Sequence, residues 1–366
     1  MPETFNLRRA LLKGLALYLL IVLLASLPLP SLGGLSAYNG LFPGRPRLPF
    51  GENPAEAYNF SLFNLDAMFA SHEIADGEKP ADEFRVLVIG DSSVWGTLLR
   101  PEETLSAQLN AAAPTFCGKT ARFYNLGYPT ISVTKDLLLL DYAARYQPDY
   151  ILWLTSLEAL PLDKQLDTPL VANNAAAIDS LIQRFNLPLD PSDPALVHPT
   201  FRERTLIGQR RALADLIRLQ LYGVQWGATG IDQTYPPYPP AQTDFKDGDD
   251  KFHDLRPPLD PSALAYDILS AGIAHSPAPV LLINEPILIS DGLNSHIRYN
   301  FFYPRWAYDD YRGQLAVRAE AEGWNYLDAW DILPPAEFTN SAIHLTPAGE
   351  TVLAQTILAA LHPNCP

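Results

Sequence analysis

Two short segments at opposite ends of the chain carry residues that could perform nucleophilic chemistry together. Gly90-Asp91-Ser92 places a hydroxyl just after a short apolar run, and a histidine begins the segment His344-Leu-Thr-Pro-Ala-Gly. A serine hydroxyl becomes a strong nucleophile when a histidine accepts its proton. The two residues lie far apart in sequence, as members of such pairs usually do, because the fold brings them together.

Both residues are expected where one regular element gives way to another. The apolar run 85–89 is typical of a buried parallel strand, so Ser92 follows the carboxyl end of that strand. In open α/β sheets this edge is where reactive groups gather. Thr346 suits the N-cap of a helix over 347–361, which puts His344 just before that helix. A capped turn and a structural histidine remain the alternative reading.

Apolar runs and helical patterns alternate between these two segments, which is typical of a doubly wound sheet. We expect a three-layer, flavodoxin-like α/β domain over 85–362 with a five-stranded parallel sheet. The predicted strands are 85–89, 122–125, 150–154, 280–284 and 324–327. Residues 161–278 are too many for one crossover, so they are predicted to form an insertion with helices near 163–185 and 203–222.

The two segments resemble the first and last sequence blocks of the SGNH (GDSL-type) hydrolases. The resemblance covers 85–361 and implies that Ser92 is the nucleophile of an esterase and His344 its base. Asn125-Leu-Gly resembles the second block, in which a glycine amide binds the oxyanion. The resemblance therefore implies that the amides of Ser92 and Gly127 form the oxyanion hole.

The end of the third strand departs from that family's pattern. The family has an asparagine there that donates to the oxyanion, whereas this chain has Thr155-Ser156-Leu-Glu. Leucine has no hydrogen-bond donor in its side chain. Thr155 or Ser156 could substitute, or two backbone amides could suffice.

A second departure lies beside the histidine. The family usually has an aspartate three residues before it, but Ser341 stands here, next to Asn340. A serine–histidine dyad could act without a third member. An acid could also come from elsewhere in the sequence, and the nearest are Asp328, Asp331 and Glu337.

Residues 1–30 are expected to be a membrane anchor or a signal segment. Arg8, Arg9 and Lys13 precede the apolar run 14–29, and no basic residue follows closely. This asymmetry predicts a cytoplasmic N-terminus and an extracytoplasmic catalytic domain. An uncleaved single-pass helix is favoured over a cleaved signal peptide, because no clean small-x-small cleavage site follows the run.

Residues 31–84 are expected to be a Pro- and Gly-rich linker followed by a segment that packs on the domain. The two cysteines, Cys117 and Cys365, both flank core elements. In an oxidising compartment they could form a disulfide, and two buried thiols are the alternative.

The composition excludes some classes of function. A net charge of −15 argues against nucleic acid as a partner. The sequence has no CxxC pair, HExxH motif or phosphate-binding glycine loop, so we expect no metal and no cofactor. Within this acidic chain, Arg204, Arg210, Arg211 and Arg218 gather in one predicted helix. They could face lipid head groups, an anionic glycan or simply solvent.

The resemblance implies an esterase or O-acyltransferase that acts on a small ester or an acylated cell-surface glycan. Members of the family with N-terminal anchors often work with membrane-bound O-acyltransferases. The expected partners are therefore the membrane and such a transferase or other membrane-complex subunits. The alternative is a non-catalytic subunit that keeps the fold and serves binding or assembly in a membrane complex.

Overall fold

A computed structural model of the chain describes residues 6–26, 34–35, 37–50, 63–229 and 248–363. Its centre is a six-stranded sheet with the order β2-β3-β1-β4-β5-β6. The strands are β1 (Glu83–Ile89), β2 (Thr115–Phe116), β3 (Lys119–Asn125), β4 (Tyr150–Thr155), β5 (Val280–Asn284) and β6 (Asn325–Asp328). The five predicted strands are present and parallel.

The sheet is nevertheless mixed, which corrects the expectation of a purely parallel one. The sixth strand, β2, pairs antiparallel with β3 through a tight turn at Cys117 and Gly118. Both turn residues have positive φ, 53° and 75°. A strand of two residues has too little alternation for a sequence pattern to reveal it.

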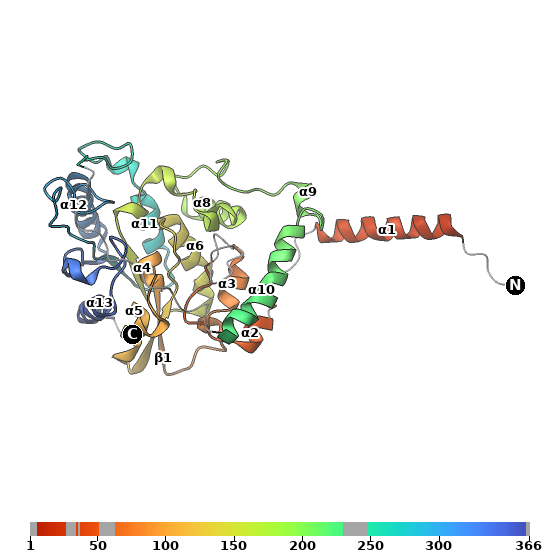
Figure 1. The fold of residues 1–366 in the computed structure, drawn as a ribbon, viewed down its shortest axis with the longest axis horizontal. Helices are drawn as coiled ribbons and strands as arrows, with labels where there is room; N and C mark the ends of the chain where they lie inside the picture. The colour runs from red at the N-terminus through yellow and green to blue at the C-terminus, as the bar shows by residue number, and fades with distance from the viewer. Residues whose placement is uncertain (1–5, 27–33, 36, 51–62, 230–247, 364–366) are drawn as a thin grey trace.

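Helices cover both faces of the sheet, so the fold has the expected three layers (Figure 1). All of β1 is buried, with Leu87 and Ile89 in one core and Val86 and Val88 in the other. The first core is covered by α6 (Val133–Ala143), α8 (Ala175–Phe185), α11 (Tyr266–Ala274) and α12 (Arg305–Glu322). The second is covered by α5 (Leu105–Ala111) and α13 (Pro347–Ala360).

The segment between β4 and β5 contains more and shorter helices than we expected. The helix predicted near 163–185 is divided, with α7 (Pro169–Ala172) preceding α8. The helix predicted near 203–222 is divided into α9 (Phe201–Arg204) and α10 (Arg210–Thr229). Between them the amide of Gly208 donates to the Thr205 hydroxyl at 3.3 Å, which makes a turn.

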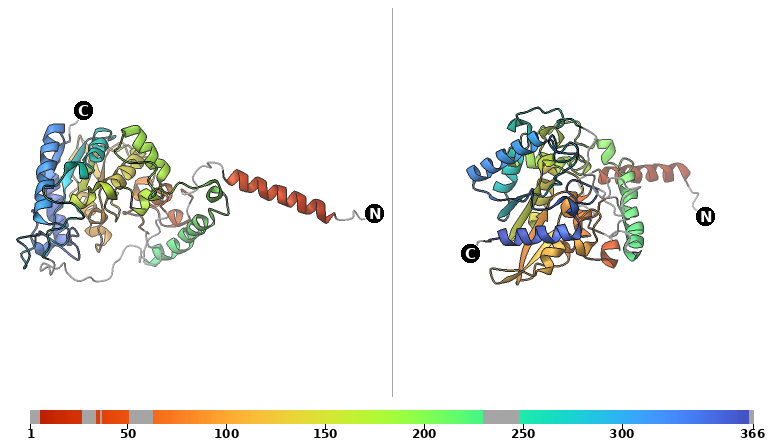
Figure 2. Two further views of the ribbon diagram at one scale, coloured as in Figure 1. Left: turned by 90° about the horizontal axis from the view of Figure 1, so that it is seen from above. Right: turned by 60° about the vertical axis from the view of Figure 1, so that its left-hand side comes forward.

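The N-terminal helix α1 (Leu7–Ala25) projects away from the α/β layers (Figure 2). We expected a membrane-spanning helix in residues 1–30. In the part of the chain that the structure describes, however, no helix has both the length and the apolarity to cross a membrane. Arg8, Arg9 and Lys13 lie in the first turns of α1, so the uncharged part of the helix is short for a span. The described residues therefore do not show the predicted spanning helix, whose apolar run 14–29 continues beyond them at residue 27.

Part of the expected linker is packed rather than free. It contains α2 (Ala37–Leu41) and, further on, α3 (Leu65–Ala70). Arg47 and Leu48 between them are buried. The Arg47 guanidinium lies over the Trp95 ring, and the Trp95 indole N–H donates to the Leu48 carbonyl at 2.8 Å. These contacts support the chain just after Ser92 from outside the sheet.

Candidate active site

Ser92 lies at the carboxyl end of β1, as the sequence predicts. It is the first residue of a short helix, α4 (Ser92–Trp95), whose N-cap is Asp91. The Asp91 carboxylate accepts from the Ser93 amide at 2.8 Å. A Cβ at Gly90 would lie 2.6 Å from Val94, so glycine allows α4 to fold back closely over the strand end. Ser92 itself is partly exposed.

The fold brings Ser92 and His344 together. The Ser92 Oγ lies 2.8 Å from the His344 Nε2, and the His344 Nδ1 lies 2.9 Å from the Oδ1 of Asn340. The amide oxygen of Asn340 can only accept, so it selects the tautomer with the proton on Nδ1. The lone pair on Nε2 then faces the Ser92 hydroxyl. This arrangement allows the histidine to take the serine proton.

Of the candidates for a third member, only Asn340 is seen to bond to the imidazole among the described residues. Asp328 instead pairs with Arg312 at 2.6 Å and accepts from the Asn284 amide at 2.8 Å. Glu337 accepts from the Thr346 hydroxyl. No bond from Ser341 or Asp331 to the imidazole is present in this part of the chain.

Burial lowers the pKa of His344 to about 4, and the carboxylate of Asp91 opposes this shift. The imidazole is therefore neutral at neutral pH and able to accept a proton. Asp91 is thus the acid whose charge acts on the histidine, although it makes no hydrogen bond to it in the described structure.

The oxyanion donors differ from the expectation. The Ser92 amide has no acceptor among the described residues, so it is available. The Gly127 amide donates to the Oδ1 of Asn125 at 3.0 Å and is already used. A Cβ at Gly127 would lie 2.3 Å from the Trp95 amide nitrogen, so this glycine lets the end of β3 pack against α4.

The two hydroxyls proposed as substitutes also differ from each other. The Ser156 hydroxyl accepts from the Tyr303 hydroxyl at 2.9 Å. The Thr155 hydroxyl is buried and has no hydrogen-bond partner in the described part of the chain. Of the pair, only Thr155 has a hydroxyl that remains free.

A buried lysine joins the two loops of the site, and the sequence interpretation missed it. The Lys135 Nζ donates to the Gly90 carbonyl at 2.7 Å and to the Tyr128 carbonyl at 3.2 Å, and it pairs with Asp136 at 2.6 Å. Burial raises the pKa of Asp136 to about 6, and Lys135 opposes the shift. The available signal was a Lys-Asp pair directly before four leucines in a helix that must pack on the sheet.

Two further carboxyls are buried behind α4. Glu285 follows β5 and accepts from the Ser93 hydroxyl at 2.5 Å, and burial raises its pKa well above the ordinary value. Glu350 lies in the first turn of α13, where burial raises its pKa to about 8. Both line one small cavity together with Ser93. Both carboxyls therefore lie on the side of α4 that Ser93 faces.

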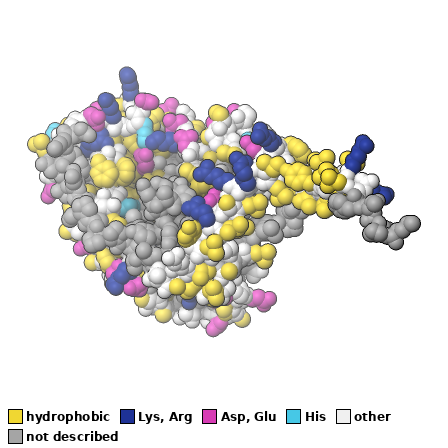
Figure 3. Space-filling view, turned by 45° about the vertical axis from the view of Figure 1, so that its right-hand side comes forward, with side chains coloured by type: hydrophobic (Ala, Val, Ile, Leu, Met, Phe, Trp, Pro, Cys, Tyr) yellow, Lys and Arg dark blue, Asp and Glu magenta, His cyan; other side chains and the backbone are white. Residues whose placement is uncertain are grey.

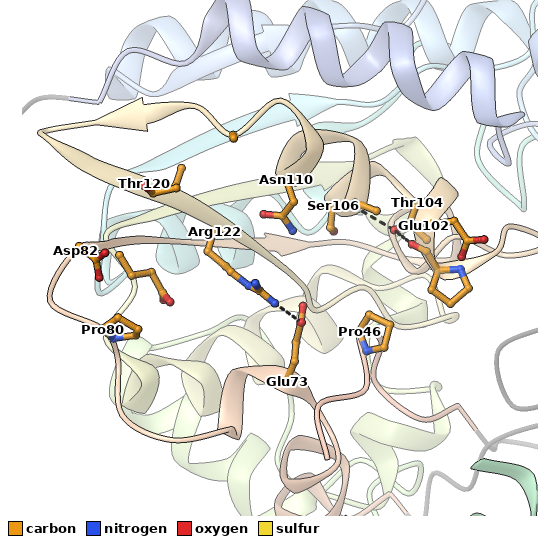
Figure 4. Close-up of a pocket in the computed structure, with 15 residues that line it drawn as sticks. Pro46, Glu73, Pro80, Asp82, Glu102, Thr104, Ser106, Asn110, Thr120 and Arg122 are labelled. Carbon is orange, nitrogen blue, oxygen red and sulfur yellow. Dashed lines mark hydrogen bonds and ion pairs between the residues drawn. The ribbon is translucent and has the colours of Figure 1, made fainter. Parts of the chain in front are cut away.

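A larger pocket lies elsewhere, along the outer edge of β3 (Figure 4). It has a volume of about 600 Å³, and the ion pair between Arg122 and Glu73 crosses its wall. The side chain of Asn110 bonds both the amide and the carbonyl of Phe123 at 2.8 Å, which blocks that edge against a further strand. Neither Ser92 nor His344 lines this pocket.

The remaining site predictions concern disulfide and metal. Cys117 is disulfide-bonded, and its expected partner Cys365 lies outside the described residues. The described residues contain no group of three or more His, Cys, Asp or Glu side chains that could hold a metal ion.

Comparison with known proteins gives structural matches only. No family model matches the chain, and no curated protein matches it. An α/β hydrolase enzyme, LAE5, from the metagenome of Lake Arreo matches at 17% identity and a TM-score of 0.34, covering 75% of this chain and 94% of that one. A member of the lipolytic G-D-S-L family from Veillonella parvula matches at 10% identity and a TM-score of 0.33, covering 75% and 96%.

An acetylxylan esterase, Axe2, from Geobacillus stearothermophilus matches at 14% identity and a TM-score of 0.33, covering 75% of this chain and 93% of that one. Identities and TM-scores this low assign neither a family nor an activity to the chain. The function has to be argued from the geometry around Ser92.

Proposed function

We propose that this chain is a serine esterase or O-acyltransferase with Ser92 as nucleophile and His344 as base. The observation that carries the proposal is the 2.8 Å contact between the Ser92 Oγ and the His344 Nε2. The Asn340 bond to the far side of the imidazole supports it, because it holds the tautomer that the reaction needs. Ser92 is partly exposed at the carboxyl end of β1, which also supports the proposal.

In the first half of the reaction, the Ser92 Oγ attacks the ester carbonyl carbon while the His344 Nε2 takes the hydroxyl proton. The Ser92 amide donates to the oxygen that becomes negative. The nearby Asp91 carboxylate favours the imidazolium, as its effect on the His344 pKa indicates. When the carbon–oxygen bond to the leaving alcohol breaks, His344 returns the proton to that alcohol, and the acyl group remains on Ser92.

The second half decides between hydrolysis and acyl transfer. Water or a sugar hydroxyl attacks the acyl carbon while the His344 Nε2 takes its proton. The bond to the Ser92 Oγ then breaks, and the proton returns to Ser92. Both outcomes use the same groups of this chain, so the acceptor that reaches the acyl group selects the product. Acylated cell-surface glycans are the substrate class that we propose.

A fluorophosphonate probe tests the nucleophile directly. We expect covalent labelling, mapped by peptide mass spectrometry to Ser92, and loss of labelling in Ser92→Ala and His344→Ala. Ser93→Ala serves as the control, because it removes the neighbouring hydroxyl and leaves the attacking one. Labelling that maps to another residue, or that survives in Ser92→Ala, would contradict the mechanism.

A non-catalytic binding or assembly subunit is the second candidate. It is favoured by the neutral Asn340 in place of an acid and by the occupied Gly127 amide, since both weaken the chemistry. A folded wild-type protein that neither reacts with the probe nor releases acetate from an activated acetate ester would support this candidate. Addition of a glycan acceptor to an active enzyme, with product analysis, separates transfer from hydrolysis.

Cell placement and partners stay predictions. An extracytoplasmic domain is proposed from the charge asymmetry of Arg8, Arg9 and Lys13, and a membrane O-acyltransferase is proposed as partner. Digestion by a protease added outside intact protoplasts tests the placement. Protection of the α/β domain under those conditions would contradict it.

A further inference from the structure

A basic surface lies on α9 and α10, outside the α/β layers (Figure 1). Residues 201–222 contain five arginines and two acids, in a chain whose net charge is −15. Both acids are engaged locally, because Glu203 caps α9 through Thr200 and Asp215 pairs with Arg218. The positive charge of the other four arginines is therefore not neutralised from within the segment.

These four arginines point outward. Arg202, Arg204, Arg210 and Arg211 are exposed, and none of them forms an ion pair with a carboxylate of the described residues. Arg210 donates only to a backbone carbonyl, that of Ile207 at 2.8 Å. We call the exposed side chains of residues 201–222 the α9–α10 face.

Large apolar side chains share this face with the arginines. Phe201, Ile207, Ile217 and Leu221 are 57%, 51%, 59% and 65% exposed. In α10 the exposed Arg210, Ala214, Ile217 and Leu221 follow helical spacing and so lie along one side of the helix, while Leu219 is buried on the other. α10 thus presents an apolar stripe with arginines at its N-terminal end.

Basic and apolar side chains also lie together next to the α9–α10 face. Figure 3 shows basic side chains gathered next to the apolar side chains of the projecting N-terminal helix. Figures 1 and 2 both show α9 close to the inner end of α1. The exposed leucines of α1 therefore lie on the same side of the molecule as the α9–α10 face.

We infer that the α9–α10 face docks on the surface of an anionic lipid bilayer. Guanidinium groups bind phosphate groups, and apolar side chains on the same helix side fit the boundary between head groups and acyl chains. A nucleic acid would carry the same phosphates, but it has no acyl-chain region to receive the exposed Ile217 and Leu221. The inference concerns contact with the bilayer surface and does not require a helix to cross it.

Vesicle co-sedimentation of the full chain tests this inference. We expect tighter binding to vesicles of phosphatidylcholine with phosphatidylglycerol than to phosphatidylcholine alone, and weakening of that preference by salt. Arg210→Glu with Arg211→Glu should weaken binding to the anionic vesicles by at least about 25-fold, since losing each basic residue near the surface costs about fivefold and the new negative charges add repulsion. Acidic residues suit the first turn of a helix, so this double variant should keep α10 folded.

Lys251→Glu with Arg256→Glu is the matched control, because it reverses two exposed charges outside the face. It should bind as the wild type does. Ile217→Ser with Leu221→Ser tests the apolar stripe and should weaken binding to both kinds of vesicle. Hydrogen exchange should show protection of 201–222 when anionic vesicles are added.

Two results would overturn the inference. The first is an anionic preference that survives Arg210→Glu with Arg211→Glu, since α1 with its own basic residues would then account for the binding. The second is unchanged exchange in 201–222 on addition of anionic vesicles.

Discussion

Two buried ion pairs lie at opposite ends of the central strands, and they make different kinds of contact. At the amino end of β1, Arg85 pairs with Glu83 at 2.5 Å and donates to the Tyr146 carbonyl at 2.9 Å. The Tyr124 hydroxyl donates to the other carboxylate oxygen of Glu83 at 3.0 Å. This pair joins the beginning of β1 to the Tyr124 side chain of β3 and to the helical turn that follows α6.

At the carboxyl end of β1, the buried cation is Lys135, and it too pairs with a carboxylate and donates to backbone carbonyls. Its ammonium is fully buried, pairs with Asp136, and donates to the carbonyls of Gly90 and Tyr128. Those two carbonyls belong to the loops that carry Ser92 and follow Gly127. In both pairs a buried cation is neutralised and hydrogen-bonded. Only Lys135 also donates to the loops that position the nucleophile.

Burial and ion pairing alone therefore do not mark a functional group. Removing one partner of a buried ion pair costs about 3–5 kcal/mol of stability, whichever pair it is. The carbonyls that receive the remaining hydrogen bonds determine whether the reaction also suffers. Lys135 is therefore a positioning residue for Ser92, and Arg85 serves the stability of the sheet.

The largest expected effect separates these two pairs. Lys135→Met and Arg85→Met should each lower the free energy of unfolding by about 3–5 kcal/mol in denaturant titrations. Only Lys135→Met should also slow probe labelling of Ser92, by about a hundredfold per folded molecule, because a small displacement of the attacking oxygen is costly. Equal labelling rates in the two folded variants would show that Lys135 does not position Ser92.

A smaller effect on rate is expected from Asn340. Asn340→Ala should lower kcat about tenfold to a hundredfold with little change in KM, because the imidazole loses the bond that holds its tautomer. The residue is exposed, so the thermal unfolding midpoint should change little. Asn340→Asp should restore a carboxylate next to Nδ1 and raise kcat above that of the alanine variant. A loss of stability equal to that of Lys135→Met would show that Asn340 has a structural role instead.

The buried Glu350, which lies near Ser93 at the carboxyl end of the strands, makes the stability of the fold depend on pH. Its folded pKa of about 8 lies above the ordinary value of 4.5, so the folded state holds a proton that the unfolded state releases. The free energy of unfolding should therefore fall as the pH rises from 4.5 through about 8. Glu350→Gln keeps the neutral shape and should be about 1–3 kcal/mol more stable than wild type above that range. Parallel stability curves for the two proteins would contradict this account.

The smallest expected effect is on the acid limb of the rate profile. His344 must be neutral to act as base, so kcat/KM should rise with pH through about 4 instead of the ordinary 6.5. Asp91→Asn keeps an N-cap of similar shape and removes the charge that favours the imidazolium, so the limb should move to a lower pH. A limb near the ordinary histidine value would mean that the imidazole is better solvated than its burial indicates.

Local signals in the sequence were enough to predict where the core strands and the last helix lie along the chain. Apolar runs over 85–89, 122–125 and 150–154 predicted three of the strands, and the threonine–proline cap predicted the start of α13. The pairing of Ser92 with His344 was expected from their residue types and from the family blocks that the two segments resemble. These predictions depend on periodicity and capping, which act over a few residues.

Only the tertiary structure decided which groups around Ser92 are free and which are used. In the folded chain Asn340, and not Asp328, bonds to the imidazole, and the Gly127 amide donates to the Asn125 side chain. Lys135 donates to the carbonyl of Gly90, next to the loop that carries Ser92. A hydrogen-bond partner distant in sequence is chosen by how elements pack, and no local pattern records that choice. Residue types and order therefore determined the pair that could react, and packing determined the groups that hold it in place.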